Sequence, residues 1–246
     1  MIRNIIATIV LAVLSILSVA AQCPNNEVWY TTNDGKKADI YCYVNQDNRI
    51  ISHTFGNGKG VIKMEADLVD LNISFKYCRN LSTVTLPGSL ESISYSSFEN
   101  CSSLESVNIP TGVTTIAESA FAGCASLKDI TIPSGVQKIP IMAFAKCVSL
   151  TSVEIPEGVT SIDVAAFEGC TGLTSVQFPS TLTSIENRAF ARCTSLSEVT
   201  IPSSVTTVGC AFSGCTQLES IKGKFASSDG RCLVVNNELV AVAPSG

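Results

Sequence analysis

The chain has 246 residues, of which 46% are hydrophobic and only 15% are charged, and its formal net charge at pH 7 is −5. It has no long run of Lys or Arg and no interleaving of basic with aromatic residues, so nucleic acid is not an expected partner. Because His53 is the only histidine, most histidine-based catalysis and most histidine-containing metal sites are excluded.

Residues 1–21 have the pattern of a secretory signal peptide. Arg3 supplies the positive start, residues 5–19 are apolar apart from one Thr and two Ser, and small residues end the segment at Ala21. We expect cleavage near Ala21 and a protein that is secreted or held at the cell surface, extracellular or associated with the outer membrane. Two alternatives stay open, an uncleaved membrane anchor and lipidation of Cys23, and only through these is the membrane an expected partner.

Residues 22–60 stand outside the repeats that follow and contain the only tryptophan, Trp29. Asn-Asp-Gly and Gly-Asn-Gly turn signals separate segments of strand-like composition, which predicts short antiparallel strands near 28–31, 40–44 and 50–55. We interpret the region as a β cap, because the end of a solenoid exposes a hydrophobic cross-section that must be covered. The alternative is that its aromatic residues form a ligand site.

Residues 61–221 consist of a motif that occurs seven times. Successive copies start 23 residues apart, except for a last step of 22. A period in this range predicts a solenoid, in which each unit contacts only its neighbours and three or more units are needed to enclose a core. Each copy begins at a phenylalanine, and these are Phe75, Phe98, Phe121, Phe144, Phe167, Phe190 and Phe212.

Each copy contains two short extended pieces. The first has the form Leu-x-x-Val/Ile-x-Ile/Leu-Pro, whose alternation points one face inward, and the second has the form Val-x-x-Ile. The Ala-rich turn before the cysteine, for example residues 118–122, is too short for an independent helix, so we expect one or two helical turns at most. The predicted fold is a β-rich solenoid with 22–23-residue rungs and short parallel strands. Its first rung strand is expected at 61–64 and its first return strand at 68–71.

Seven of the eleven cysteines belong to the repeat, because they recur three residues after its phenylalanine. We interpret them as a ladder of buried, reduced thiols that behave as small hydrophobic residues. For the other four, disulfides Cys23–Cys42 and Cys210–Cys232 are the alternative to free thiols. No Cys-x-x-Cys occurs, which excludes zinc-ribbon and thioredoxin-type sites. The repeat cysteines are Cys78, Cys101, Cys124, Cys147, Cys170, Cys193 and Cys215.

The repetition ends after Ile221. In residues 222–246, two apolar runs flank Asn236 and Asn237, which predicts a β-hairpin. The alternative is that this segment starts further repeats.

The copies resemble leucine-rich repeats of the BspA-like type, also called the Treponema pallidum type. The flanking segments 26–36, 58–63 and 224–235 also resemble this family. The resemblance implies a secreted or surface protein of a bacterium, with a role in adhesion and in binding a host extracellular-matrix or surface protein. In the third copy the residues that match the family pattern are Phe121, Cys124, Leu127, Ile130, Ile132, Pro133, Val136, Ile139 and Ala143.

No catalytic constellation is present: the sequence lacks Gly-x-Ser-x-Gly, His-Glu-x-x-His and the phosphate-binding glycine loops. We therefore expect no enzymatic activity, no catalytic residues, no cofactor and no metal. A protein-binding face is predicted instead on the outward positions of the first extended piece. A glycan ligand and a structural spacer without a ligand are the alternatives. The candidate positions are Thr83, Thr85, Ser106, Asn108, Asp129, Thr131, Ser152, Glu154, Ser175, Gln177, Glu198 and Thr200.

Overall fold

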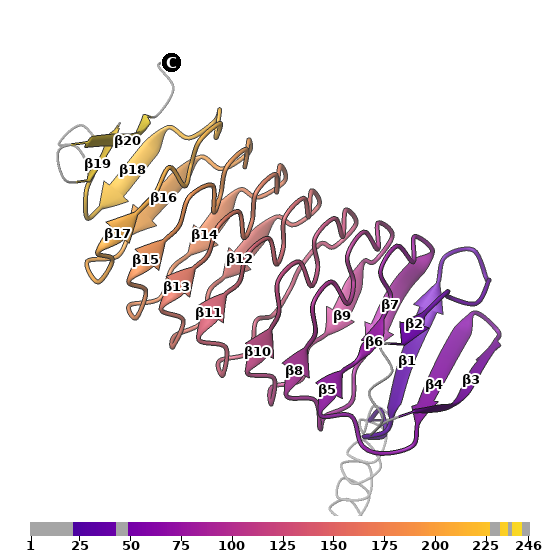
Figure 1. The fold of residues 1–246 in the computed structure, drawn as a ribbon. Helices are drawn as coiled ribbons and strands as arrows, with labels where there is room; N and C mark the ends of the chain where they lie inside the picture. Colours follow the sequence, from indigo (N-terminus) through magenta and orange to yellow (C-terminus); the bar gives the residue numbers. More distant parts are fainter. Residues whose placement is uncertain (1–21, 43–48, 227–231, 236–237, 243–246) are drawn as a thin grey trace, which may run out of the picture.

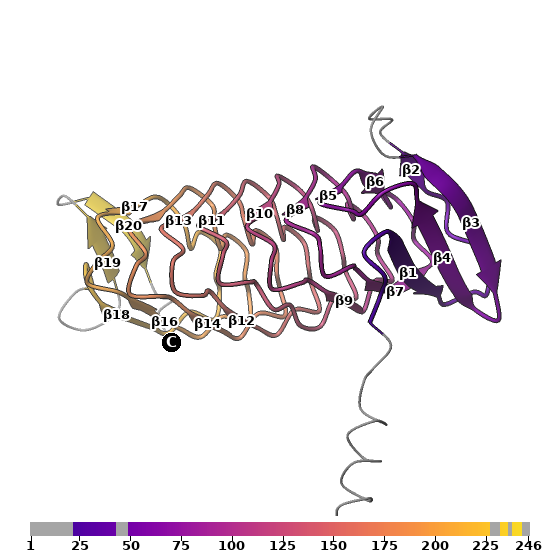
Figure 2. The same cartoon turned by 90° about the horizontal axis from the view of Figure 1, so that it is seen from below.

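The computed structural model describes residues 22–42, 49–226, 232–235 and 238–242, and the predicted signal peptide lies outside these residues. The chain forms an elongated β-solenoid, with an antiparallel cap at the N-terminal end (Figure 1). Two sets of short strands run along its opposite long sides (Figure 2). We call these sides the strand face and the return face. The predicted solenoid is confirmed.

The N-terminal cap is an antiparallel sheet that joins the strand face directly. The sheet order is β3-β4-β1-β7-β9, so β1 pairs antiparallel with β4 on one side and with the first repeat strand on the other. The segment expected as the first rung strand, 61–64, was wrongly assigned: it belongs to β4, which pairs antiparallel with β1 and β3. A short pair, β2 and β6, completes the cap. These strands are β1 (Glu27–Thr32), β2 (Tyr41–Cys42), β3 (Ile50–Gly56), β4 (Lys59–Met64) and β6 (Ile73–Ser74).

The strand face consists of short parallel strands in register. Thr83 lies opposite Ser106, and Ser152 lies opposite Ser175, so equivalent repeat positions form rows across the face. Residues 129–131 follow the same path without forming a strand. The strands of this face are β7 (Leu81–Thr85), β9 (Ser106–Asn108), β12 (Ser152–Glu154), β14 (Ser175–Gln177), β16 (Glu198–Ile201) and β18 (Ser220–Gly223).

The return face has two parallel ladders separated by one break. The first ladder has the order β10-β8-β5 and the second β11-β13-β15-β17. The expected first return strand is confirmed, since Asp70 and Leu71 pair with the next rung. The strands are β5 (Asp70–Leu71), β8 (Ser92–Ile93), β10 (Thr115–Ile116), β11 (Lys138–Ile139), β13 (Ser161–Ile162), β15 (Ser184–Ile185) and β17 (Thr207–Val208).

A proline explains the break between β10 and β11. In other rungs the residue after the return strand donates its N–H to the preceding rung, as Asp163 does to the Ile139 carbonyl at 2.8 Å. The equivalent residue of the broken rung is Pro140, which has no N–H to donate. The stack holds there through the turn edge, where the Phe121 N–H donates to the Ala143 carbonyl at 2.8 Å.

The core is a column of phenylalanines that runs the length of the solenoid. The rings of successive copies stack nearly parallel, with centroids 5.2 Å apart between Phe98 and Phe121 and 5.6 Å apart between Phe190 and Phe212. Six of the seven rings are fully buried. Leu and Ile of each rung surround the column, and each such side chain contributes roughly 1.5–3 kcal/mol when buried. One rung alone cannot enclose this core, which is why the repeat must stack.

The repeat cysteines form a second column, and each thiol has a defined partner. The Cys147 thiol donates to the carbonyl of Phe121, and the Cys170 thiol donates to that of Phe144, at 3.3 and 3.1 Å. The first thiol, Cys78, donates to the carbonyl of Asp39 in the cap. All seven are free and buried, as predicted. Each thiol thus pairs with the carbonyl of a phenylalanine one rung back, or of the cap.

The other two described cysteine side chains are also free. The Cys23 thiol donates to the Glu27 carbonyl at 3.2 Å, and Cys210 is exposed. Neither of the two alternative disulfides is therefore formed in this structure.

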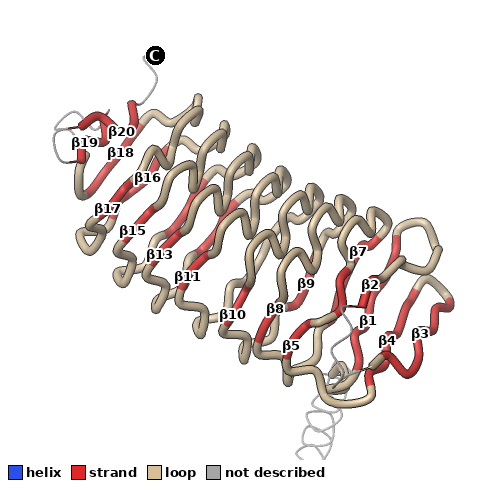
Figure 3. The backbone as a smooth tube through the Cα atoms, viewed as in Figure 1, coloured by secondary structure: helices blue, strands red, loops and turns tan. Residues whose placement is uncertain are grey.

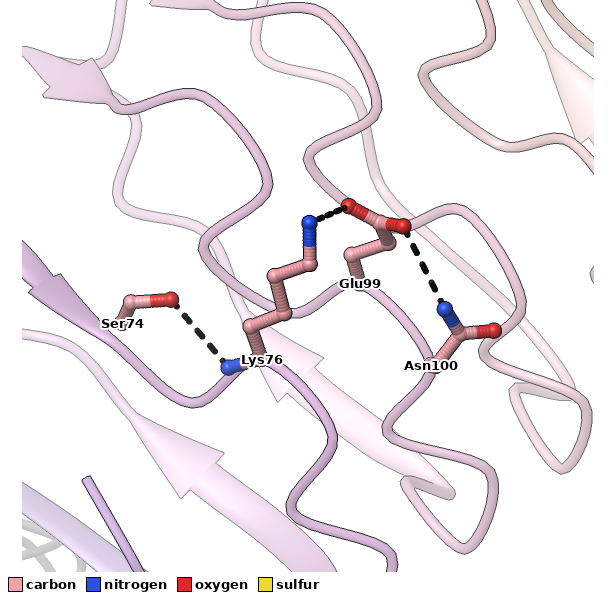
Figure 4. A network of polar contacts seen from close by, with 4 residues as sticks. All are labelled: Ser74, Lys76, Glu99 and Asn100. Atoms are coloured by element: carbon pink, nitrogen blue, oxygen red, sulfur yellow. Dashed lines mark hydrogen bonds and ion pairs between the residues drawn. The ribbon is translucent and has the colours of Figure 1, made fainter. Parts of the chain in front are cut away.

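The turn edge connects the return face to the next strand, and no helix is assigned in the described part of the chain (Figure 3). The segment expected to form helical turns has instead a tight turn closed by an i→i+3 bond, as from the Ala122 N–H to the Ser119 carbonyl at 3.1 Å. Figure 4 shows the turn edge near the cap, where Lys76 Nζ lies 2.7 Å from Glu99 Oε2. Although burial alone would raise it, bonds from Lys76 and Ser96 hold the pKa of Glu99 below its ordinary value.

The C-terminal segment forms the predicted hairpin. Strand β19 (Cys232–Val235) pairs antiparallel with β20 (Glu238–Val242). Within the ranges that the structure describes, no helix is long and apolar enough to span a membrane.

Candidate binding face

The structure places all twelve predicted positions on the strand face. Ten of them are exposed, while Thr83 and Thr85 are half-buried because the cap strand β1 packs beside them. Asp129 and Thr131 lie on the stretch that forms no strand, but they keep their place in the row. The prediction that these side chains point outward is therefore correct in geometry, whereas their role in binding stays a prediction.

Most of these side chains form no hydrogen bond or ion pair with another described side chain. Asn108 is an exception, because its Oδ1 accepts the Leu86 N–H at 2.8 Å and so extends the ladder. Glu198 pairs with Lys222, and Thr83 shares a hydroxyl hydrogen bond with Thr31. The pKa of Lys128 is raised mainly by its bond to Glu105, and the negative charge of Asp129 contributes to this increase. The other eight form no hydrogen bond or ion pair with another described side chain: Thr85, Ser106, Thr131, Ser152, Glu154, Ser175, Gln177 and Thr200.

The return face uses similar residues differently. The Thr183 hydroxyl donates to the Thr160 carbonyl at 2.8 Å, and the Thr206 hydroxyl donates to the Thr183 carbonyl at 3.1 Å. Thr160 bonds in the same way to Gln137 at 3.2 Å. These hydroxyls of the return face thus stabilise the stack. Most outward hydroxyls of the strand face form no such bond and are therefore available to a ligand.

Sequence reasoning missed that the strand face continues onto the cap. The register places Val61, Trp29 and Thr85 in one row, which continues to Asn108. The row beside it contains Lys59, Thr31 and Thr83. A signal was present, because residues 27–32 and 59–64 alternate between buried and outward positions as the repeat strands do.

The buried thiols are unsuited to chemistry. Burial raises the pKa of Cys124, Cys147 and Cys170 well above the ordinary thiol value, and it raises that of Cys215 to about 11. The thiolate is the reactive form, so these groups are inert while the solenoid is folded. No group of three or more His, Cys, Asp or Glu placed to hold a metal occurs among the residues described above.

Comparison with known proteins identifies the repeat. The profile of the BspA type leucine rich repeat region matches residues 71–163 and 137–228, with six copies of the repeat. The chain belongs to the BspA-type leucine-rich repeat family. BspA-type repeat proteins are bacterial surface proteins, and the resemblance noted from the motif alone is confirmed.

Solved structures of bacterial leucine-rich repeat proteins share the fold. A leucine-rich repeat protein from Bacteroides ovatus is 30% identical, with a TM-score of 0.61 over 72% of this chain and 47% of that one. A leucine rich cell surface protein from Faecalibacterium prausnitzii is 37% identical, with a TM-score of 0.56 over 65% of this chain and 42% of that one. This chain therefore spans less than half the length of either relative. Among curated proteins the search finds no match.

Proposed function

We propose that this protein is a secreted or cell-surface binding module that docks a protein partner, such as a host extracellular-matrix or surface protein, on its strand face. The observation that carries the proposal is the set of eight outward side chains, in two neighbouring rows, whose polar atoms have no partner within the described chain. They lie on parallel strands about 4.8 Å apart, which gives a broad and regular surface. Export through cleavage near Ala21 is part of the proposal.

The face is polar, with carboxylates at Asp129, Glu154 and Glu198. A partner with basic and hydrogen-bonding groups is complementary to such a surface, and charge complementarity of this kind directs association and register. Within the repeats no aromatic residue stands at the outward positions, which disfavours a glycan as the main ligand of this part of the face.

Surface plasmon resonance tests this proposal. The chain lacking residues 1–21 is passed over purified host matrix proteins and, in parallel, over a glycan array. We expect binding to at least one matrix protein, and we expect the double substitution Glu154→Arg and Gln177→Arg to weaken it at least about tenfold, because added cations repel a basic partner and block the row.

The return face supplies a matched control. Thr115→Arg, Gln137→Arg and Thr207→Arg together add the same charge, +3, at exposed positions on the opposite side. This variant is expected to bind as the unmodified chain does. Equal loss in both variants would contradict a strand-face site. Glycan binding alone would indicate the saccharide-binding alternative, and no binding in either assay would indicate a spacer.

A further inference from the structure

A depression of about 210 Å³ interrupts the cap end of the strand face. It lies over β4, β1 and β7, where the cap meets the first repeat. We propose that this depression anchors the protein partner by taking up one apolar side chain that is flanked by a carboxylate. The inference rests on the proposed function and adds where the partner is held and what it presents. The lining side chains are those of Trp29, Thr31, Lys59, Val61, Thr83 and Thr85.

The walls of the depression are held in place before any ligand arrives. The indole N–H of Trp29 donates to Glu27 Oε2 at 2.8 Å, which fixes the ring along its own strand. On the opposite side the hydroxyl oxygens of Thr31 and Thr83 lie 2.7 Å apart. Two residues of the lining, Tyr30 and Gly60, contribute backbone, because the Tyr30 ring is buried beneath the sheet. A preformed recess of this kind binds without first ordering its side chains.

The apolar wall distinguishes this place from the rest of the face. Trp29 and Val61 are adjacent in one row, whereas every outward position predicted on the repeats is polar. Tryptophan is among the residues that most often carry the binding energy of protein interfaces, especially beside a recess that excludes water. The volume is below the roughly 300–1,000 Å³ of small-molecule sites, which suits a single side chain.

The charge around the depression selects what flanks that side chain. Lys59 and Lys63 both point outward from β4, and neither forms an ion pair with another described residue. One carboxylate, Glu27, lies opposite Lys63 and accepts the Trp29 N–H, so one net positive charge is left among these three charged side chains. The cap end of the face is thus basic while the repeats carry carboxylates, so a partner carboxylate is complementary beside the depression.

These contacts favour a protein over a saccharide here. A sugar stacked on tryptophan needs an open ring face and polar atoms near its edge. Trp29 is half-buried, and its only polar atom is already bonded to Glu27. An apolar side chain needs neither, so a saccharide is left as an outcome of the test.

The chain offers a direct probe, because Trp29 is its only tryptophan. A displayed library of random twelve-residue peptides is selected against the chain lacking residues 1–21. We expect the selected peptides to share an aromatic or aliphatic residue within two positions of Asp or Glu. Their binding should shift the Trp29 emission to the blue, since burying the indole removes it from water. By anisotropy of fluorescein-labelled peptides, Trp29→Ala should weaken binding at least about tenfold.

Two further variants test the site without removing its aromatic wall. Thr85→Arg fills the depression from β7 and should also weaken binding at least about tenfold. Lys59→Glu should change the preferred flanking residue from acidic to basic. Thr115→Arg, at an exposed position on the return face, is the matched control, and it should leave affinity unchanged. Circular dichroism confirms that each variant is folded.

The outcomes separate this inference from the proposed function. Peptides that bind but resist Trp29→Ala and Thr85→Arg, and lose affinity with the Glu154 and Gln177 variant, would overturn the anchor and leave the binding face. A library that yields no binder would overturn both. An emission shift with N-acetylglucosamine or glucose hexasaccharides, and none with peptides, would replace the protein anchor with a saccharide platform.

Discussion

The cap and the repeats close their hydrophobic surfaces by different means. In the repeats each contact is a copy of the one before it, as in the phenylalanine column and the thiol-to-carbonyl bonds. In the cap each contact occurs once. The Tyr30 hydroxyl accepts the Ala38 N–H at 3.4 Å, and its oxygen lies 2.7 Å from His53 Nε2, with which it shares a hydrogen bond.

This difference determines how the loss of one contact affects the stability of each region. A repeated contact is supported on both sides, so the loss of one is felt by two neighbouring rungs. A contact in the cap has no such copies, so it depends on one residue pair and on its protonation state. The only tryptophan lies in the cap, so tryptophan emission reports the cap while far-ultraviolet circular dichroism is dominated by the rest of the chain. Unfolding followed by both signals therefore compares the two regions in one sample.

The largest effect is expected in the repeat column. Phe144→Ala removes a fully buried ring that stacks on two neighbours, and it should lower the free energy of unfolding by about 3–5 kcal/mol. Chemical denaturation measures the change. Phe178, which is half-buried outside the column, is the matched control, and Phe178→Ala should cost clearly less. A loss below about 1 kcal/mol for Phe144→Ala would show that the column does not carry the core.

A smaller effect, confined to the cap, is expected from Gly60→Ala. The added Cβ would lie 1.9 Å from the Tyr30 ring, which is almost fully buried and must move. Overpacking of this kind lowers the free energy of unfolding by about 1–3 kcal/mol. The denaturation midpoint followed by tryptophan emission should therefore fall, while the midpoint followed by circular dichroism should change less. Gly56→Ala meets nothing within 4 Å and is the control. Equal shifts of both transitions would mean that cap and repeats unfold as one unit.

Next in size is Cys147→Ala, which removes a buried thiol and its bond to the Phe121 carbonyl. The expected cost is about 1–2 kcal/mol, since the hydrogen bond of the thiol is lost and a small cavity replaces the buried sulfur, while the Phe121 carbonyl keeps its bond from the Cys124 N–H at 3.2 Å. Alkylation tests the same column without mutation. Iodoacetamide should modify Cys210 in the folded protein and reach the seven column thiols only on unfolding. Rapid modification of Cys147 under native conditions would contradict the buried column.

The smallest expected effect is that of pH on the cap. Burial, with the nearby Lys37 charge, lowers the pKa of His53 from 6.5 to about 4. A group whose folded pKa is lowered in this way favours the folded state when it is neutral. The cap should therefore have its full stability above pH 6.5 and lose stability as the pH falls toward 4. Because the imidazole is partly exposed, the loss should be roughly 1 kcal/mol.

Unfolding followed by tryptophan emission at pH 7 and pH 4.5 measures this loss. His53→Gln is the control, because a glutamine side chain does not titrate. The repeats contain no histidine, so their transition should change less. An equal pH dependence in the His53→Gln variant would rule out His53 as the cause.

The sequence by itself determined the repeat part of this protein. The 23-residue period places Phe98 on Phe121 and Cys124 near the Phe98 carbonyl, because in a solenoid equal positions of successive copies must stack. It also determined which side chains point outward, since strands alternate between faces.

Only the tertiary structure decided how the cap is joined to that stack. Tyr30 reaches His53 and Thr31 reaches Thr83, and neither pair joins equal positions of two repeat copies. Such contacts depend on how β1 inserts between β4 and β7, which also placed 61–64 in the cap and Trp29 on the strand face. In a periodic sequence each residue packs on the equivalent residue of the next copy, so its contacts can be predicted from the period. A segment without copies has no such rule, so its contacts are known only from the folded structure.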